Sequence, residues 1–224
     1  MLELPKNASK TWDLKHKVGT PQKILLIQLR RIGDVLMTTP SIRALRDAFP
    51  QARITFLTEP PSDQVLQYNT SINHLILHHP KAKLKESVHF LYDLYQQHFD
   101  LVIDFFGNTR SALMSWVTRA PYRIGFNFRG RRWLYNHYVP LGKEAVYAAQ
   151  HKSLLVKCLG VSVNSFHLDF PINQTDRNYA DQLFHQFHLT QDDCVVSLSP
   201  VSRQPYKVWN PERFAQIADC HSPH

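Results

Sequence analysis

Short apolar runs of β type alternate with helical patterns along this chain, and this alternation constrains the fold more than any other feature. Strands are expected at residues 23–29, 53–58, 74–78 and 101–106, and helices at 34–49, 84–98 and 109–118. Such an order predicts βαβ units and a parallel sheet. The runs at 24–27 and 101–103 are apolar on both faces, so they should lie at the centre of the sheet.

The sequence predicts three segments: an N-terminal extension, a first domain and the start of a second domain. Residues 1–22 are polar and contain Pro5, Gly19 and Pro21, so they predict a loose, flexible extension that buries little surface. Residues 23–172 form the expected first domain, including an Arg-rich segment at 119–138 without a clear assignment and a helix at 144–159. Residues 173–224 would hold a linker helix (176–188) and the start of a second domain, with a strand at 194–199 and a helix from Pro211.

Composition and charge narrow the class of protein. With 43% hydrophobic residues among 224, the chain can bury a substantial core. No apolar run approaches the roughly 20 residues that cross a bilayer, and residues 1–20 lack a signal-peptide core, so a cytoplasmic protein is expected. Three separated cysteines favour neither a disulfide framework nor a zinc site. The formal charge of +8 predicts anionic partners, which include nucleic acid, acidic lipid and phosphorylated sugars.

Gly33 and Asp34 follow the first strand, where open α/β sheets bind ligands. Gly33 is expected to allow a tight turn, and the positive end of the next helix would keep the Asp34 carboxylate ionised. Asp34 is therefore a candidate base, although an ordinary helix N-cap is the simpler interpretation from position alone. The chain contains neither G-x-G-x-x-G nor a P-loop motif, so a dinucleotide-dependent dehydrogenase and a P-loop enzyme are disfavoured.

Several motifs together resemble glycosyltransferase family 9, the heptosyltransferases. They are the run Arg-Ile-Gly-Asp-Val-Leu-Met-Thr-Thr-Pro at 31–40, Asp104-x-x-Gly107, Arg123-Ile124-Gly125, Gln150-His151, Ser199-Pro200 and Lys207-x-Trp209-x-x-Glu212-x-Phe214. The resemblance extends over roughly residues 23–219. It implies the GT-B architecture, in which two Rossmann-like domains face each other across a cleft. The first would bind the acceptor and the second mainly the nucleotide sugar, and this chain would hold only the first βα unit of the second domain.

The resemblance also implies roles for particular residues. Asp34 would be the general base that takes the acceptor proton as the anomeric carbon is attacked with inversion, and Lys207 would offset the charge on the departing ADP. No metal and no cofactor are required. The acceptor-binding candidates are Gly33, Asp104, Gly107, Arg123, Arg129, Arg131, Arg132 and His151. The donor-binding candidates are Ser199, Ser202, Arg203, Lys207 and Trp209.

Some of these residues have a structural alternative. Asp104 could contact the acceptor or, equally well, could only organise the turn that leads from its strand to Gly107. His151 could serve helix packing. The arginines of 119–138 could form a solvated basic face or bind nucleic acid, but the resemblance favours the carboxylates and phosphates of a lipopolysaccharide acceptor.

The chain departs from the family near its end. The family's D-[ST]-G-x-x-H segment does not follow Phe214, and residues 219–224 should break the helix, so a truncated or frameshifted chain is expected. The expected function is heptose transfer from ADP-heptose to the lipopolysaccharide core, or to a lipid A precursor, at the inner membrane of a Gram-negative bacterium. Nucleic acid is not an expected partner. The alternatives are a non-catalytic remnant or anionic-glycolipid-binding module and, from charge alone, a nucleic-acid-binding domain.

Overall fold

The chain folds as two compact units, Met1–Asn173 and Gln174–His224. The computed structural model describes residues 14–128, 130, 132–140, 147–190, 192–202 and 204–221. The boundary between the units follows Asn173, one residue after the boundary expected from the sequence.

The first unit is built around a six-stranded sheet whose order is β3-β2-β1-β4-β5-β6. All neighbouring strands are parallel. The strands are β1 (Lys23–Ile27), β2 (Arg53–Thr58), β3 (His74–Leu77), β4 (Leu101–Asp104), β5 (Tyr122–Phe126) and β6 (His137–Val139). This is the Rossmann order, in which the chain returns to the centre after β3 and leaves a crevice between the ends of β1 and β4. The four expected strands are confirmed, and β5 and β6 lie in the segment that the sequence left unassigned.

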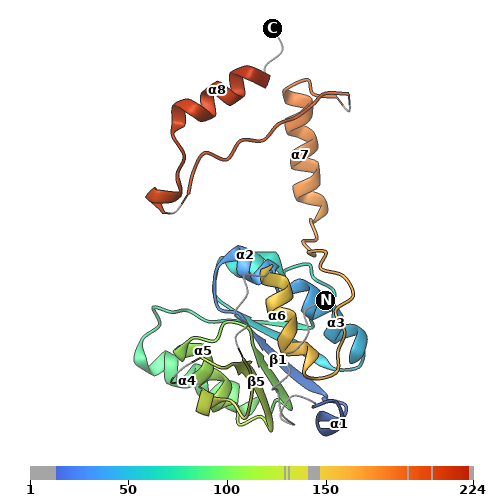
Figure 1. Cartoon of the computed structure of the whole chain (residues 1–224), viewed down its shortest axis with the longest axis vertical. Helices are drawn as coiled ribbons and strands as arrows, with labels where there is room; N and C mark the ends of the chain where they lie inside the picture. Colours follow the sequence, from blue (N-terminus) through green and yellow to red (C-terminus); the bar gives the residue numbers. More distant parts are fainter. Residues whose placement is uncertain are drawn as a thin grey trace. The chain divides into compact units, whose positions relative to one another are not determined.

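Helices cover both faces of the sheet (Figure 1). Ile24 and Leu26 of β1 pack in one apolar cluster with α3 (Thr39–Ala48) and α6 (Ala148–Lys157). Leu25 and Ile27 pack in a second cluster with α4 (Leu84–Gln96) and α5 (Thr109–Val117). Because neighbouring side chains of β1 serve opposite faces and all are buried, the central strand expected from the sequence is confirmed. Shorter elements are α2 (Ile32–Leu36), η1 (Ser62–Val65) and η2 (Arg132–Leu134).

Part of the expected loose extension packs on the first unit. Leu14 is buried in the apolar core and its N–H donates to the carbonyl of Cys158 at 2.9 Å. The short helix α1 (Lys15–Val18) follows, and the Tyr122 hydroxyl donates to the Lys17 carbonyl. The expectation of a flexible segment is therefore wrong for residues 14–18, because one apolar side chain and two hydrogen bonds anchor them. Residues 1–13 lie outside the described residues.

The second unit contains α7 (Gln174–Gln186), η3 (Pro205–Lys207) and α8 (Pro211–His221). The strand expected at 194–199 is wrong: these residues belong to no strand, and Val195, Val196 and Leu198 are exposed. An apolar run becomes a strand only where another strand supplies hydrogen-bond partners, and none is found within the described part of this unit. Helix α8 continues to His221, so the helix break expected from residue 219 is also wrong.

Candidate functional site

Asp34 lies on α2, directly after the carboxyl end of the central strand β1. The N-cap of α2 is Arg31, no side chain caps this helix, and Asp34 is its third residue. The interpretation of Asp34 as an N-cap is therefore wrong. The Asp34 side chain is half-buried just beyond the carboxyl end of β1, the edge at which open α/β sheets bind ligands.

The tight turn before α2 forms at Arg31 and not at Gly33. Arg31 adopts φ 68, a left-handed conformation that non-glycine residues rarely occupy. Gly33 lies inside α2, is exposed, and has no atom within 4 Å of the position where a Cβ would be. The backbone beside Asp34 is therefore not covered by other atoms at this position.

Lys152 is a site residue that the sequence did not indicate. Helix α6 carries it to the same edge of the sheet, where its Nζ donates to Oε1 of Gln28 at 2.6 Å. Burial lowers the pKa of Lys152 to about 8, while the negative charges of Asp34 and Asp104 act in the opposite direction. A buried ammonium group thus lies within the field of both carboxylates. The neighbouring Gln150-His151 motif was a signal, but it did not show which side chain of the helix faces the sheet.

Asp104 organises the turn after β4. Its Oδ1 accepts hydrogen bonds from the N–H groups of Phe106 (2.9 Å) and Gly107 (3.0 Å), and its Oδ2 accepts one from the Tyr135 hydroxyl (2.6 Å). The carboxyl group is fully buried; this burial raises the pKa of Asp104, and the hydrogen bonds oppose the rise. Any contribution of Asp104 to acceptor binding therefore comes through the turn that it holds.

Gly107 is the residue of this turn that must be glycine. It has φ 64, and an added Cβ would lie 2.4 Å from the Phe128 ring. A side chain at this position would be strained by the backbone conformation and would also displace an aromatic ring. The Asp104-x-x-Gly107 motif thus shapes the loop that follows β4 at the carboxyl edge of the sheet.

His151 and Arg123 have structural roles in this unit. The His151 ring stacks on Phe126 with 4.3 Å between ring centroids, and burial together with the charge of Lys152 lowers the pKa of His151, so the ring is neutral at neutral pH. Arg123 lies toward the amino end of β5, where its guanidinium donates to the carbonyls of Ala120 (2.7 Å) and Leu134 (3.2 Å). The structure does not bring Arg123 to Asp34, because β5 presents Gly125, not Arg123, beside Asp104.

Three further arginines are candidates for acceptor binding. Arg129 and Arg131 lie outside the described residues, and Arg132 begins η2. Arg123 lines an open pocket of about 390 Å³ with Trp116 and Arg119.

A second charged group follows β2 at the same edge of the sheet. The buried Glu59 carboxylate accepts a hydrogen bond from Arg110 (3.1 Å) and lies 3.2 Å from Nδ1 of His78 and 3.9 Å from Nε of Arg30. Burial lowers the pKa of His78, against the opposing effect of Glu59. Arg30 and Arg110 are partly exposed, so a single carboxylate holds two guanidinium groups that also face solvent. The sequence did not indicate this cluster, because its members come from four separate segments.

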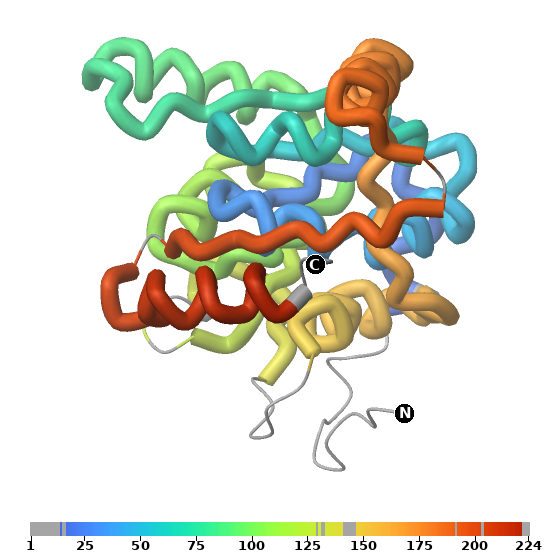
Figure 2. Tube along the Cα trace, turned by 90° about the horizontal axis from the view of Figure 1, so that it is seen from above, coloured from blue at the N-terminus to red at the C-terminus, as the bar shows by residue number. Residues whose placement is uncertain are grey.

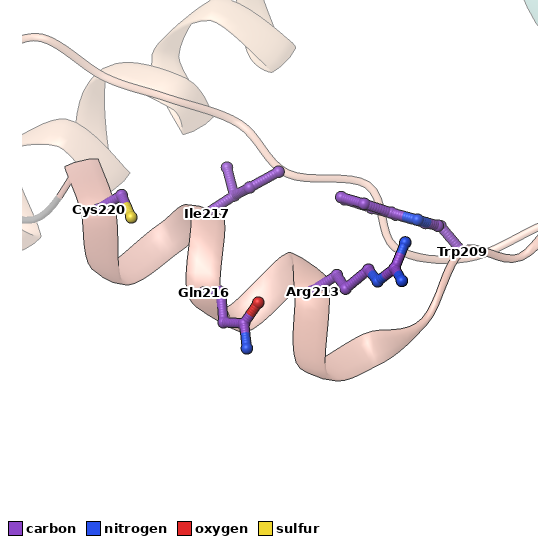
Figure 3. A pocket seen from close by; sticks show the side chains of 5 residues that line it. All are labelled: Trp209, Arg213, Gln216, Ile217 and Cys220. Atoms are coloured by element: carbon purple, nitrogen blue, oxygen red, sulfur yellow. The ribbon is translucent and has the colours of Figure 1, made fainter.

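In the second unit, Trp209 lines a pocket of about 300 Å³ with Arg213, Gln216, Ile217 and Cys220 (Figure 3). The Arg213 guanidinium lies 5.9 Å from the centroid of the Trp209 ring. Lys207 ends η3, with its Nζ 5.8 Å from the Tyr206 ring centroid. Ser199 and Ser202 precede it, and Arg203 lies outside the described residues. The candidate base Asp34 and the candidate leaving-group residue Lys207 thus belong to different units.

Within the described ranges, no three His, Cys, Asp or Glu side chains gather in a way that could hold a metal ion. No helix in the same part of the chain has the length and apolar character needed to span a bilayer.

The Rossmann-ordered parallel sheet, with Asp34, Lys152 and the Asp104 turn at its central crevice, defines an α/β ligand-binding domain of the kind that binds substrates outside the carboxyl ends of its strands. Residues 88–223 match the profile of glycosyltransferase family 9 (heptosyltransferase). The chain therefore belongs to this family.

Individual relatives agree with this assignment. The chain is 25% identical over 207 residues to lipopolysaccharide heptosyltransferase 3 of Escherichia coli, covering 86% of this chain and 58% of the relative. A family 9 glycosyltransferase structure from Veillonella parvula superposes with a TM-score of 0.78 at 28% identity, over 89% of this chain and 59% of that one. The structure of the E. coli heptosyltransferase WaaC with ADP-2-deoxy-2-fluoro heptose gives a TM-score of 0.64 at 21% identity, over 88% of this chain and 65% of that one. The expected family and GT-B-type fold are confirmed, and the chain spans somewhat under two thirds of these relatives.

Proposed function

We propose that this chain carries the acceptor side of a glycosyltransferase that moves a heptose or related sugar from ADP-heptose to the lipopolysaccharide core, with inversion and without a metal or cofactor. The observation that carries the proposal is the half-buried Asp34 at the central crevice, beside the buried ammonium group of Lys152. Family membership supports it, as do the E. coli relative named as a lipopolysaccharide heptosyltransferase and the WaaC structure with an ADP-heptose analogue.

In the proposed reaction, an acceptor hydroxyl oxygen bonds to the anomeric carbon as the bond from that carbon to ADP breaks. Asp34 takes the hydroxyl proton, and the bonding electron pair leaves with the diphosphate. The negative charge of Asp34 acts on the buried amine of Lys152 and opposes the lowering of the Lys152 pKa. Lys207 offsets the charge that develops on ADP.

Recognition of the acceptor is proposed to rest on the cationic groups at the same sheet edge. Glu59 holds Arg30 and Arg110 in place but neutralises only one of their two charges. Guanidinium groups match carboxylates and phosphates, which the lipopolysaccharide core or a lipid A precursor would present. Arg129, Arg131 and Arg132 remain further candidates for this contact. The proposal places the protein at the cytoplasmic face of the inner membrane of a Gram-negative bacterium, with no nucleic-acid partner.

The test is the release of ADP from ADP-heptose in the presence of an inner-core lipopolysaccharide acceptor. In a version of this protein that spans the full length of its relatives, we expect Asp34→Asn to lower turnover by roughly a hundred- to ten-thousandfold, because a general base is lost, while acceptor binding is unchanged. Asp47→Asn, which changes an exposed aspartate of α3, is the matched control and should leave turnover unchanged.

Equal turnover of the Asp34→Asn variant and the unaltered full-length version would remove Asp34 from the mechanism. Acceptor binding without any ADP release by that full-length version would favour the alternative of a non-catalytic, anionic-glycolipid-binding module.

A further inference from the structure

Helix α4 presents an apolar stripe to solvent. Its members Leu84, Val88, Tyr92 and Tyr95 recur at intervals that place them on one face of the helix. Leu84 is 82% exposed and Val88 is 59% exposed. The neighbouring face, which includes the buried Leu94, packs on the sheet. The apolar surface of α4 is therefore wider than the part that the packing of the first unit buries.

Helix α5 adds further exposed apolar side chains. It contacts α4 on the same face of the sheet, and its Leu113 and Trp116 are also exposed. We call the six residues Leu84, Val88, Tyr92, Tyr95, Leu113 and Trp116 the α4–α5 patch. Figure 1 and Figure 2 both show α4 at the periphery of the first unit. An exposed apolar surface spread over two neighbouring helices is typical of an interaction site.

The charges around the patch indicate which partner it fits. Lys81, Lys83 and Lys85 cluster at the start of α4. The acidic groups of the helix are engaged locally: Glu86 accepts a hydrogen bond from the Lys83 N–H at 2.9 Å, and Asp93 lies 3.6 Å from His89. Tyrosine and tryptophan place an apolar ring beside a polar tip, which suits the boundary between head groups and acyl chains. Aliphatic, aromatic and lysine side chains together match the surface of an anionic bilayer.

The direction of α4 agrees with such a partner. Because α4 follows β3 in a parallel sheet, the helix starts at the carboxyl edge of the sheet, which is also the edge that carries Asp34 and Glu59. The lysine cluster therefore lies at the side of the unit from which an acceptor would reach the crevice. The formal charge of +8 attracts an anionic surface and opposes the association of two copies of the chain.

We propose that the α4–α5 patch docks this protein on an anionic bilayer surface, with α4 lying in the head-group region. The inference rests on the proposed function only in that the acceptor is lipid-linked. Vesicle binding requires neither donor nor acceptor, so its failure and the failure of the transfer reaction are observed separately.

The test is co-sedimentation of the full chain with sucrose-loaded vesicles of phosphatidylethanolamine and phosphatidylglycerol, compared with phosphatidylcholine vesicles. We expect Leu84→Gln, Val88→Gln and Tyr92→Gln together to lower the partition coefficient by roughly tenfold or more, because buried apolar area drives the docking of interfacial helices. The control is Val201→Gln with Tyr206→Gln, which removes side chains that are just as exposed from the second unit. Circular dichroism checks that the helices are retained.

A second variant tests the charge. Lys81→Gln, Lys83→Gln and Lys85→Gln together should weaken binding to the anionic vesicles and reduce its dependence on salt. Unchanged partitioning of the Leu84, Val88 and Tyr92 variant would overturn the proposal. A concentration-dependent dimer that this variant abolishes, with vesicle binding unaffected, would also overturn it and make the patch an interface between copies.

Discussion

Replacing Lys152 by methionine removes a buried charge while nearly keeping the length of the side chain. Lys152 is 7% exposed, and burial lowers its pKa from the ordinary 10.5 to about 8. In the unfolded chain the amine regains its ordinary pKa. At pH values between the folded pKa of about 8 and the unfolded pKa of 10.5, the unfolded chain therefore binds more protons than the folded chain. Over this range Lys152 makes the folded state more stable as the pH rises.

The magnitude follows from the pKa of the folded state. Each pKa unit corresponds to about 1.36 kcal/mol, so the change at Lys152 corresponds to about 3 kcal/mol of unfolding free energy between pH 7.5 and 10.5. The Lys152→Met variant lacks this contribution. We therefore expect the stability of the unaltered chain to rise relative to that of the variant by about 3 kcal/mol over this interval. The comparison cancels groups that titrate equally in both proteins.

Urea denaturation followed by circular dichroism at pH 7.5, 9.0 and 10.5 measures this difference. Lys157→Met, on the same helix, is the matched control for the loss of a lysine side chain. If the difference between Lys152→Met and the unaltered chain stayed constant with pH, Lys152 would not be a buried amine of lowered pKa.

Two further predictions concern the turn after β4. Gly107→Ala should lower the free energy of unfolding by about 1–3 kcal/mol, because φ is positive and the new Cβ would meet Phe128. Gly130→Ala is also at positive φ but has open space around it, so it should lower the free energy of unfolding by less. Thermal unfolding of the two variants measures the difference. Tyr135→Phe should lower the free energy of unfolding by about 1–3 kcal/mol at pH 7, because the buried Asp104 carboxyl group loses a hydrogen-bond donor. Urea denaturation measures this, with the exposed Tyr138→Phe as the control. Equal losses of stability in the two variants would contradict a stabilising hydrogen bond at Tyr135.

The parts of the fold that the sequence predicted are those with a strong local pattern. Strand β1 is apolar at every interior position, and α4 keeps a helical period over thirteen residues. Strand β5 escaped assignment because Arg123 and Gly125 interrupt its apolar pattern, although Arg123 is held by backbone carbonyls. Conversely, residues 194–199 have a strand-like sequence but no partner strand in the described part of the second unit. Local pattern predicts a strand only when the fold supplies its neighbours.

The sequence could predict those residues of the candidate site that lie at the end of a strand or just after it. Asp34 and Asp104 both follow central strands, so a parallel sheet had to bring them to one edge. Lys152 was not predictable, because it lies 124 residues from its hydrogen-bond partner Gln28 and only the packing of α6 brings them together. The same holds for Tyr135, which reaches Asp104 from a segment without a recognisable pattern.

Environment separates the roles of the two carboxylates at this edge. Asp104 is fully buried, and three hydrogen bonds commit its oxygens to the turn and to Tyr135. Asp34 is half-buried, caps no helix end, and lies beside a glycine that leaves the backbone open. Both carboxylates act on the buried amine of Lys152, but only Asp104 is closed off from solvent. These environments support the proposal that Asp34 is the base, and they assign Asp104 to the turn after β4.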